Sequence, residues 1–98
     1  MTIGTKKEGS ALTIALEGRL DTVTSPELEK TLADALSDVK ELTFDLANLE
    51  YVSSAGLRVL LLAQKTMNAQ GKMTVRNVGE TVNEIFEVTG FSDILTIE

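Results

Sequence analysis

Two hydrophobic periods alternate along this chain and limit what it can fold into. Apolar residues recur at every second position around residues 12–16, 42–46 and 73–75, which predicts strands with one apolar face. Between and after these segments the apolar spacing changes to three and four residues, which is typical of helices. A further short strand-like segment precedes the first of these strands. The predicted order is therefore β-β-α-β-α-β-α-β, and this order favours an α/β fold.

Turn and capping residues mark where the predicted elements begin and end. Gly9 can adopt the positive φ of a tight turn, so residues 7–10 are expected to close an N-terminal β-hairpin. Thr24 and Glu27 have the spacing of a capping box for the first helix. The expected later elements are a first helix from about Ser25 to Ser37, a second from Ser53 or Ser54 to Gln70, a third from about Val78 to Thr89 and a final strand from Ile94 to Ile97.

The polar second face of each strand indicates where the helices pack. Thr43 and Asp45, for example, alternate with the apolar residues of their strand, whereas a sheet covered on both faces has continuously apolar strands. This pattern predicts helices mainly on one face. Because crossovers between parallel strands are right-handed, that arrangement requires strands to be added progressively in one direction. We therefore expect a mixed sheet of about five strands, with an N-terminal hairpin followed by parallel pairings, in one domain of residues 1–98.

The composition argues against most classes of function. The chain has neither cysteine nor histidine, which excludes disulfides, thiolate nucleophiles, Ser-His triads and Cys/His metal sites. Its formal net charge is -6 and its nine basic residues are dispersed, so nucleic-acid binding is not expected. The longest apolar run, Val59 to Ala63, is too short to span a bilayer. We expect a soluble, cytoplasmic protein that uses no metal or cofactor and does not enter a membrane.

The run from Tyr51 to Leu61 places two serines between a predicted strand and the long apolar helix. A helix start presents free N–H groups and the positive end of the helix dipole, which suit an oxyanion or a phosphorylated side chain. Gly56 permits a close backbone approach, and Leu57 begins the apolar face. The spacing alone favours a simpler role, in which one serine only caps the helix.

The segment from Phe44 to Leu61, together with Gly18, Leu20 and Asp21 before a Thr/Ser-led helix, resembles the STAS domain of bacterial anti-sigma factor antagonists. The resemblance implies a single STAS domain over residues 1–98 and phosphorylation of Ser54. It also implies that the unphosphorylated form binds an anti-sigma factor with serine kinase activity and displaces the sigma factor. Phosphorylation then releases the protein until a phosphatase resets it, and the ATP belongs to the kinase.

The loops at the carboxyl ends of the predicted strands are expected to meet at one edge, which would bring Asp21 close to Ser54. The residues expected to contact the partner are Arg19, Asp21, Ser53, Ser54, Gly56, Leu57 and Arg58. Asp21 is equally consistent with a turn residue. Ser53 and Arg19 stand where many members of the family have acidic residues. Ser53 is therefore a rival phosphate acceptor, and Arg19 either pairs with the phosphate or selects a different partner.

Two alternatives to this function remain open in the sequence. The same fold can serve a different partner, such as a transporter or lipid-trafficking complex, or another kinase network. An enzyme with Ser54 as nucleophile would need a base, and without histidine only a lysine could serve. Lys65 lies about three turns along the helix on its polar side. We therefore expect a regulatory binding protein and no enzyme activity.

Overall fold

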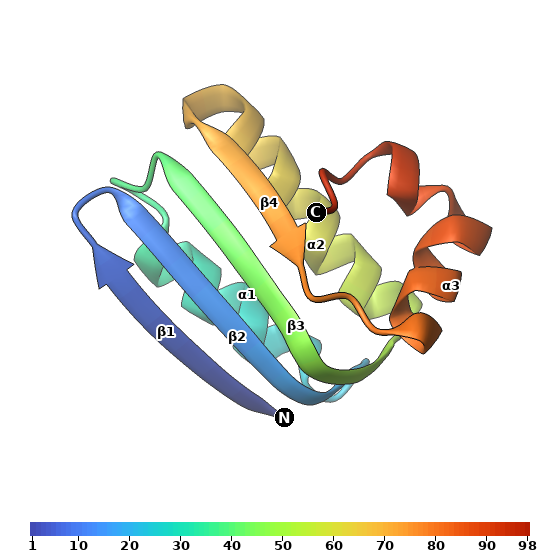
Figure 1. Cartoon of the computed structure of the whole chain (residues 1–98). Coiled ribbons are helices and arrows are strands. Elements are labelled where there is room, and N and C mark those ends of the chain that lie inside the picture. The colour runs from blue at the N-terminus through green and yellow to red at the C-terminus, as the bar shows by residue number, and fades with distance from the viewer.

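The computed structural model describes all 98 residues as a four-stranded sheet with three helices and a short 3-10 turn (Figure 1). The strands are β1 (Thr2–Glu8), β2 (Ala11–Leu20), β3 (Glu41–Val52) and β4 (Lys72–Arg76), and the helical elements are α1 (Ser25–Ala35), α2 (Ser54–Gln70), α3 (Glu80–Thr89) and η1 (Phe91–Asp93). The strand order is β1-β2-β3-β4, antiparallel in the first pair and parallel in the next two. The predicted α/β class, the hairpin and the progressive strand order are confirmed.

The predicted fifth strand is wrong, and the sheet has four strands. Residues 94–97 make only an isolated parallel bridge, between Val75 and Ile97. The backbone N–H groups of Ile94 and Leu95 both donate to the carbonyl of Phe91, at 3.0 and 2.8 Å. Because η1 holds these N–H groups in a helical turn, only the residues after them are left to pair with β4.

The capping box predicted for α1 is also wrong. The Thr24 hydroxyl donates to the carbonyl of Arg19 at 2.8 Å and accepts from the N–H of Asp21 at 2.9 Å, so it faces the preceding loop. No side chain caps α1, and Asp21 organises the turn before the helix instead, since its Oδ1 accepts the N–H groups of Val23 and Thr24. The helix itself ends at Ala35, two residues before the predicted end.

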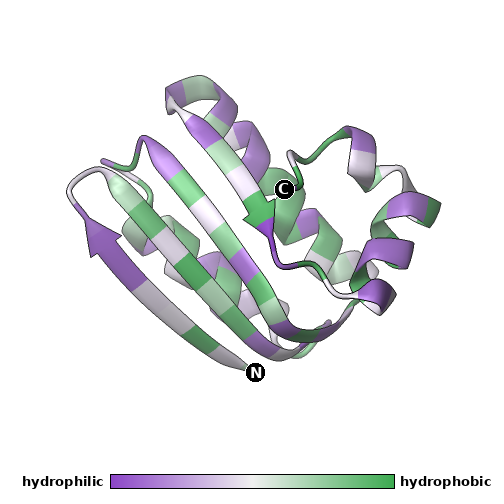
Figure 2. Cartoon of the chain, viewed as in Figure 1, coloured by the Kyte–Doolittle hydropathy of each residue, from purple (hydrophilic) through white to green (hydrophobic).

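The helices α1 and α2 cover one face of the sheet, and α3 stands beyond the carboxyl ends of β3 and β4 (Figure 1). Apolar and polar residues alternate along the strands, as Figure 2 shows. A single hydrophobic core of 23 buried residues lies between the sheet and the helices, with Phe44 of β3 and Phe86 of α3 among its largest members. The prediction that helices pack mainly on one face is confirmed. None of the three helices combines the length and the apolar character needed to cross a membrane.

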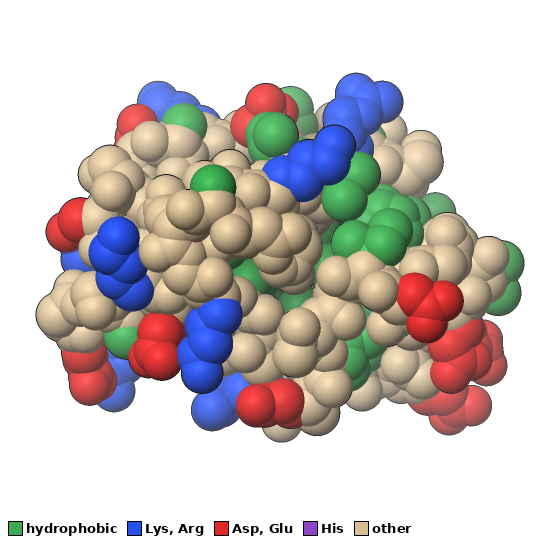
Figure 3. All heavy atoms as spheres, turned by 90° about the horizontal axis from the view of Figure 1, so that it is seen from above, with side chains coloured by type: hydrophobic (Ala, Val, Ile, Leu, Met, Phe, Trp, Pro, Cys, Tyr) green, Lys and Arg blue, Asp and Glu red, His purple; other side chains and the backbone are tan.

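Acidic charge is concentrated in the C-terminal part of the fold. Residues 77–98 contain five acidic side chains and no lysine or arginine, whereas residues 1–76 carry ten acidic and nine basic side chains. Figure 3 shows acidic side chains along the end of the molecule that holds α3, with exposed apolar side chains next to them. The net charge of -6 is therefore mostly a property of α3 and the residues that follow it.

Two glutamines of α2 differ in their hydrogen bonds: Gln64 has a buried oxygen without a donor, whereas the amide nitrogen of Gln70 donates to two carbonyls. Gln64 is only 6% exposed; its amide nitrogen donates to Asn68 Oδ1 at 2.8 Å, but no donor of the protein reaches its Oε1. The amide nitrogen of Gln70 donates to the carbonyls of Leu36 and Val39, at 2.6 and 2.7 Å, and so ties the end of α2 to the α1–β3 loop.

We expect Gln64→Met to raise the free energy of unfolding by about 1–2 kcal/mol, because it removes a buried unsatisfied oxygen at similar volume. Gln70→Met is the matched control and should lower the same quantity by about 1–3 kcal/mol, because it leaves two carbonyls without their donor. Urea denaturation of the two variants measures both changes. If Gln64→Met destabilised the protein as Gln70→Met does, the account of Gln64 would be contradicted.

Candidate functional site

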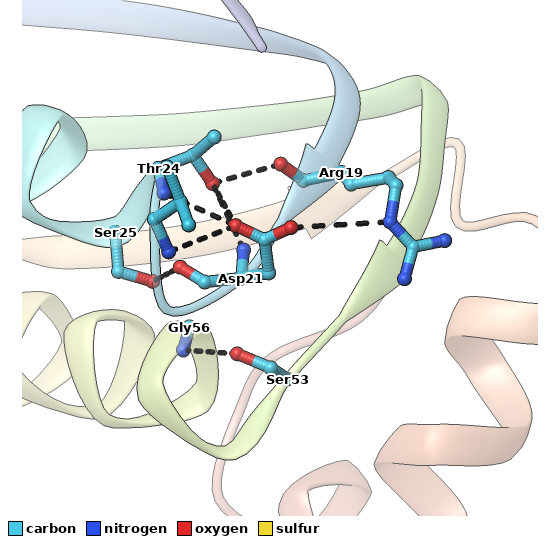
Figure 4. Close-up of polar contacts among 7 residues, drawn as sticks. Arg19, Asp21, Thr24, Ser25, Ser53 and Gly56 are labelled. Carbon is cyan, nitrogen blue, oxygen red and sulfur yellow. Dashed lines mark hydrogen bonds and ion pairs between the residues drawn. The ribbon is translucent and has the colours of Figure 1, made fainter.

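The loop between β2 and α1 is organised by the carboxylate of Asp21 (Figure 4). Its Oδ1 accepts the N–H groups of Val23 and Thr24, at 3.0 and 3.1 Å, and shares the single hydrogen of the Thr24 hydroxyl, at 3.2 Å, with the Arg19 carbonyl. These bonds, led by the backbone N–H of Thr24, hold the pKa of the Asp21 carboxyl below its ordinary value. Asp21 is thus a turn residue, and only its second oxygen is directed away from the loop.

That second oxygen lies next to Arg19, the last exposed residue of β2. Arg19 Nε is 3.9 Å from Asp21 Oδ2, and the Arg19 guanidinium lies over the Tyr51 ring, 4.4 Å from its centroid. The cation–π contact follows from the sheet register, in which Arg19 is opposite Tyr51 on β3. Arg19 therefore links the β2–α1 loop to the end of β3, although its side chain remains 60% exposed.

The depressed pKa of Asp21 predicts a contribution to stability that depends on pH. An ordinary aspartate titrates near pH ~3.9, so the contribution is complete above that value and is lost as the pH falls through the folded pKa. We expect Thr24→Val to raise the pKa of Asp21, because it removes the hydroxyl donor. The measurement is the carboxyl ¹³C shift of Asp21 against pH, with Thr22→Val as a control at an exposed neighbour. An ordinary pKa for Asp21 in the unsubstituted protein would refute this account.

The two serines at the start of α2 have different environments. Ser53 is the N-cap: its Oγ accepts the N–H of Gly56 at 3.3 Å, and its backbone N–H donates to the carbonyl of Leu20 at 2.8 Å. Ser53 is half-buried, whereas Ser54, the first residue of the helix, is exposed. The bond to Leu20 also joins the ends of β2 and β3, so the chain leaves the sheet toward Asp21 and toward Ser54 at neighbouring points.

Gly56 is buried against the end of β2. A Cβ at this position would lie 2.7 Å from Leu20 Cγ and 2.8 Å from the Leu20 carbonyl oxygen. Leu57, next to it, is 7% exposed and belongs to the core. Among the seven predicted contact residues, Arg19, Ser54 and Arg58 are exposed, Asp21 and Ser53 are half-buried, and Gly56 and Leu57 are buried. The two buried residues hold the start of α2 in place, and the exposed ones are accessible to a partner.

A groove of about 490 Å³ opens beside Ser54, between the start of α2 and α3. Its wall on the sheet side consists of Tyr51, Val52, Ser54 and Leu57, and its wall on α3 consists of Thr81, Glu84, Ile85, Val88 and Thr89. A second groove, of about 350 Å³, lies between α1 and α2 and includes Leu62. The structure contains no group of three or more acidic side chains placed to hold a metal ion.

Comparison with known proteins identifies the family of this chain. A family model described as "Mlab, STAS domain" matches residues 3–96. The chain belongs to the STAS domain family. It is 32% identical to the putative anti-sigma factor antagonist BtrV of Bordetella bronchiseptica, over 99% of this chain and 85% of BtrV. It is 27% identical to the anti-sigma-B factor antagonist of Staphylococcus aureus, over 99% of this chain and 92% of that protein.

Solved structures agree with this assignment at the level of the fold. The unphosphorylated form of the Bacillus anti-sigma factor antagonist SpoIIAA superposes with a TM-score of 0.85 at 18% identity, over 99% of this chain and 88% of that one. Its phosphorylated form superposes with a TM-score of 0.77 at 17% identity, over 99% and 91% of the two chains. The STAS fold expected from the sequence is therefore confirmed, and the relatives reported above are named anti-sigma factor antagonists.

The contribution of α3 to the groove of this STAS domain was missed in the sequence. The spacing of Val82 and Phe86 identifies the buried stripe of α3, and both residues are in the core. Ile85 and Val88 form a second apolar stripe at i and i+3, which faces the groove beside Ser54. The signal was present in the sequence, since Ile85 and Val88 are apolar residues in addition to Val82 and Phe86. In the structure Val88 lies outside the core and is 87% exposed. Its meaning depends on where α3 lies relative to α2, which the local pattern does not specify.

Proposed function

We propose that this STAS domain is an anti-sigma factor antagonist that is switched by phosphorylation of Ser54. The unphosphorylated form binds an anti-sigma factor with serine kinase activity and frees the sigma factor; the phosphorylated form dissociates until a phosphatase restores it. Both relatives above carry the name of an anti-sigma factor antagonist, and SpoIIAA is named in a phosphorylated and an unphosphorylated form. Because sigma factors act on RNA polymerase, the proposal assigns the protein to the cytoplasm.

The observation that carries this proposal is the division of roles between the two serines. The Ser53 oxygen is engaged as the helix cap, whereas Ser54 is exposed and lines the groove next to α3. A kinase must bring the γ-phosphate of ATP in line with the attacking hydroxyl, so it requires an accessible side chain. Ser54 meets this requirement without any loss of structure. Ser53, in contrast, is half-buried and its oxygen accepts the Gly56 N–H, so a kinase would first have to free this side chain.

The local charges support a switch in binding without unfolding. A phosphate on Ser54 would add about -1.5 to -2 charges at the positive end of the α2 dipole, where a negative charge is stabilised. Arg58 follows Ser54 by four residues on the exposed side of α2 and forms no ion pair in the structure, so it is available to the phosphate. The partner, in contrast, would have to bury the new charge against the groove. The fold is therefore expected to persist while the complex dissociates.

We propose a regulatory role without catalysis for the same residues. The Ser54 hydroxyl takes part in none of the side-chain hydrogen bonds of the α2 start, where the Ser53 oxygen is the group engaged. Lys65 lies three turns along α2, roughly 16 Å away by helical rise, too far to take the Ser54 proton. The alternative is that this STAS domain is an adaptor for a different partner. The family description includes the name "Mlab", so the experiment includes this alternative among its outcomes.

Mapping the phosphate tests the proposed function. The protein is incubated with Mg-ATP and the anti-sigma factor kinase of the same genome, and modified residues are located by mass spectrometry. We expect phosphate on Ser54 in the unsubstituted chain and in Ser53→Asn, a variant that keeps a capping side chain but has no hydroxyl. We expect none in Ser54→Ala. Phosphate on any other residue would reject Ser54 as the site, and a kinase that neither binds nor modifies the protein would favour the adaptor alternative.

A further inference from the structure

The groove beside Ser54 is lined mainly by apolar side chains, with one acidic side chain among them. Tyr51, Leu57, Ile85 and Val88 supply apolar surface, and Glu84 stands among them. Val88 is 87% exposed although it is apolar, because no other part of the chain covers this side of α3. An isolated exposed valine needs no explanation, but one that lines a groove of about 490 Å³ together with other apolar side chains marks a surface for binding.

The α3 side of this groove carries charge of one sign, whereas the two nearby arginines, Arg19 over the Tyr51 ring and Arg58 of α2, belong to the opposite side. Glu80, Glu84 and Glu87 lie on exposed positions of α3, and Asp93 and Glu98 follow in the C-terminal segment. No basic side chain occurs among residues 77–98 to neutralise them. A partner that approaches this end of the molecule therefore meets a negative potential on the α3 side of the groove, which favours basic groups and repels acidic ones.

This charge pattern selects among possible occupants. Nucleic acids and anionic lipid surfaces would be repelled by the same carboxylates. A second copy of this chain would place the acidic α3 faces against each other if it docked symmetrically at this groove, which is unfavourable. What remains is a segment of another protein that has an apolar side chain for the groove and positive charge beside it.

We propose that the groove between the start of α2 and α3 binds a partner segment in which an apolar side chain is flanked by lysine or arginine. The inference rests on the proposed function only in that the segment would belong to the partner that reads Ser54. The apolar contact with Tyr51, Leu57, Ile85 and Val88 governs how slowly the segment leaves. The carboxylates of α3 govern how fast it arrives and how strongly binding depends on salt.

The division between close apolar contact and long-range charge attraction also explains how a phosphate on Ser54 would weaken the binding of a basic partner. Ser54 belongs to the wall of the groove, so a phosphate there would have to be buried beneath the apolar side chain of the segment. Long-range attraction to the acidic face would persist, and the close apolar contact would be lost. Release then results from a faster dissociation rate.

The test uses two synthetic helical peptides that share one leucine-containing core, one flanked by lysines and the other by glutamates. Each is titrated into the ¹⁵N-labelled protein, and backbone amide shifts are recorded. We expect the lysine-flanked peptide to shift the amides of Leu57, Ile85 and Val88. Its affinity should fall as salt rises from about 0.1 to about 1 M, where the Debye length shrinks from about 10 to about 3 Å. The glutamate-flanked peptide should leave these amides unchanged.

Two variants separate the acidic charge of α3 from the apolar lining of the groove. Glu84→Lys combined with Glu87→Lys should weaken the lysine-flanked peptide about tenfold and remove its salt dependence, and Val88→Gln should weaken it to a similar extent but preserve the salt dependence. Glu27→Lys combined with Glu29→Lys, on exposed positions of α1, is the control and should change little. Equal binding of both peptides, no shift in the groove, or shifts confined to the groove between α1 and α2 would overturn the inference. The assay contains neither kinase nor ATP, so its failure is distinct from a failure of the proposed phosphorylation.

Discussion

Gly56→Ala is expected to lower the free energy of unfolding by about 1–3 kcal/mol, although alanine is the better helix former by about 1 kcal/mol. The added Cβ would lie 2.7 Å from Leu20 Cγ, 2.8 Å from the Leu20 carbonyl oxygen and 3.0 Å from Val52 Cγ1. Leu20 is fully buried and Val52 is 2% exposed, so neither can move into solvent to make room. The constraint is the close packing of α2 against β2.

Urea denaturation of Gly56→Ala measures this effect, with Gly4→Ala as the control. A Cβ at Gly4, in β1, would meet nothing closer than 3.9 Å, so this variant should be nearly neutral. The Leu20 carbonyl also accepts the N–H of Ser53, so a displaced Leu20 should move the start of α2 and slow the phosphorylation of Ser54. If Gly56→Ala stabilised the protein, as in an unconstrained helix, the close approach of the two elements would be disproved.

The features that depend on neighbours in the sequence were predictable. The start of α2 at Ser53 and Ser54 and the left-handed turn at Gly9 were identified correctly, because a capping side chain and a positive φ are local properties. Gly56 was identified as a point of close approach, but its contact with Leu20 depends on the pairing of β2 with β3. The sequence therefore indicated the kind of contact without its partner.

The features that depend on distant segments were not predictable. Thr24 has the spacing of a capping box, yet the Arg19 carbonyl and the Asp21 N–H engage its hydroxyl, because the loop folds back on the helix start. Ile97 has the pattern of a strand residue, but η1 limits its pairing to a single bridge with Val75. The α3 wall of the groove was missed for the same reason, since only the packing of α3 places Val88 near Ser54.

Ser54→Asp is expected to weaken binding to the anti-sigma factor by at least about 2 kcal/mol, or roughly thirtyfold in Kd. The carboxylate would lie on the wall of the groove. A bound partner would remove its water without placing a positive group to pair with it. Its effect on folding should be small and favourable, because a negative charge in the first turn of α2 gains about 0.3–1 kcal/mol from the helix dipole. Lower affinity without any loss of stability is the signature of a binding switch.

Three companion variants separate charge from shape at this position, with Kd measured by isothermal titration calorimetry and stability by urea denaturation. Ser54→Asn matches the aspartate in size without its charge, and Ser54→Ala removes the hydroxyl; both should bind like the unsubstituted protein. Ser53→Asp places the charge one residue earlier, where aspartate is also a good helix cap, and it should weaken binding less because Ser53 is half-buried outside the groove wall. If Ser54→Asn weakened binding as much as Ser54→Asp, a steric effect would replace the charge mechanism. Equal affinity of Ser54→Asp and the unsubstituted chain would remove Ser54 from the contact surface altogether.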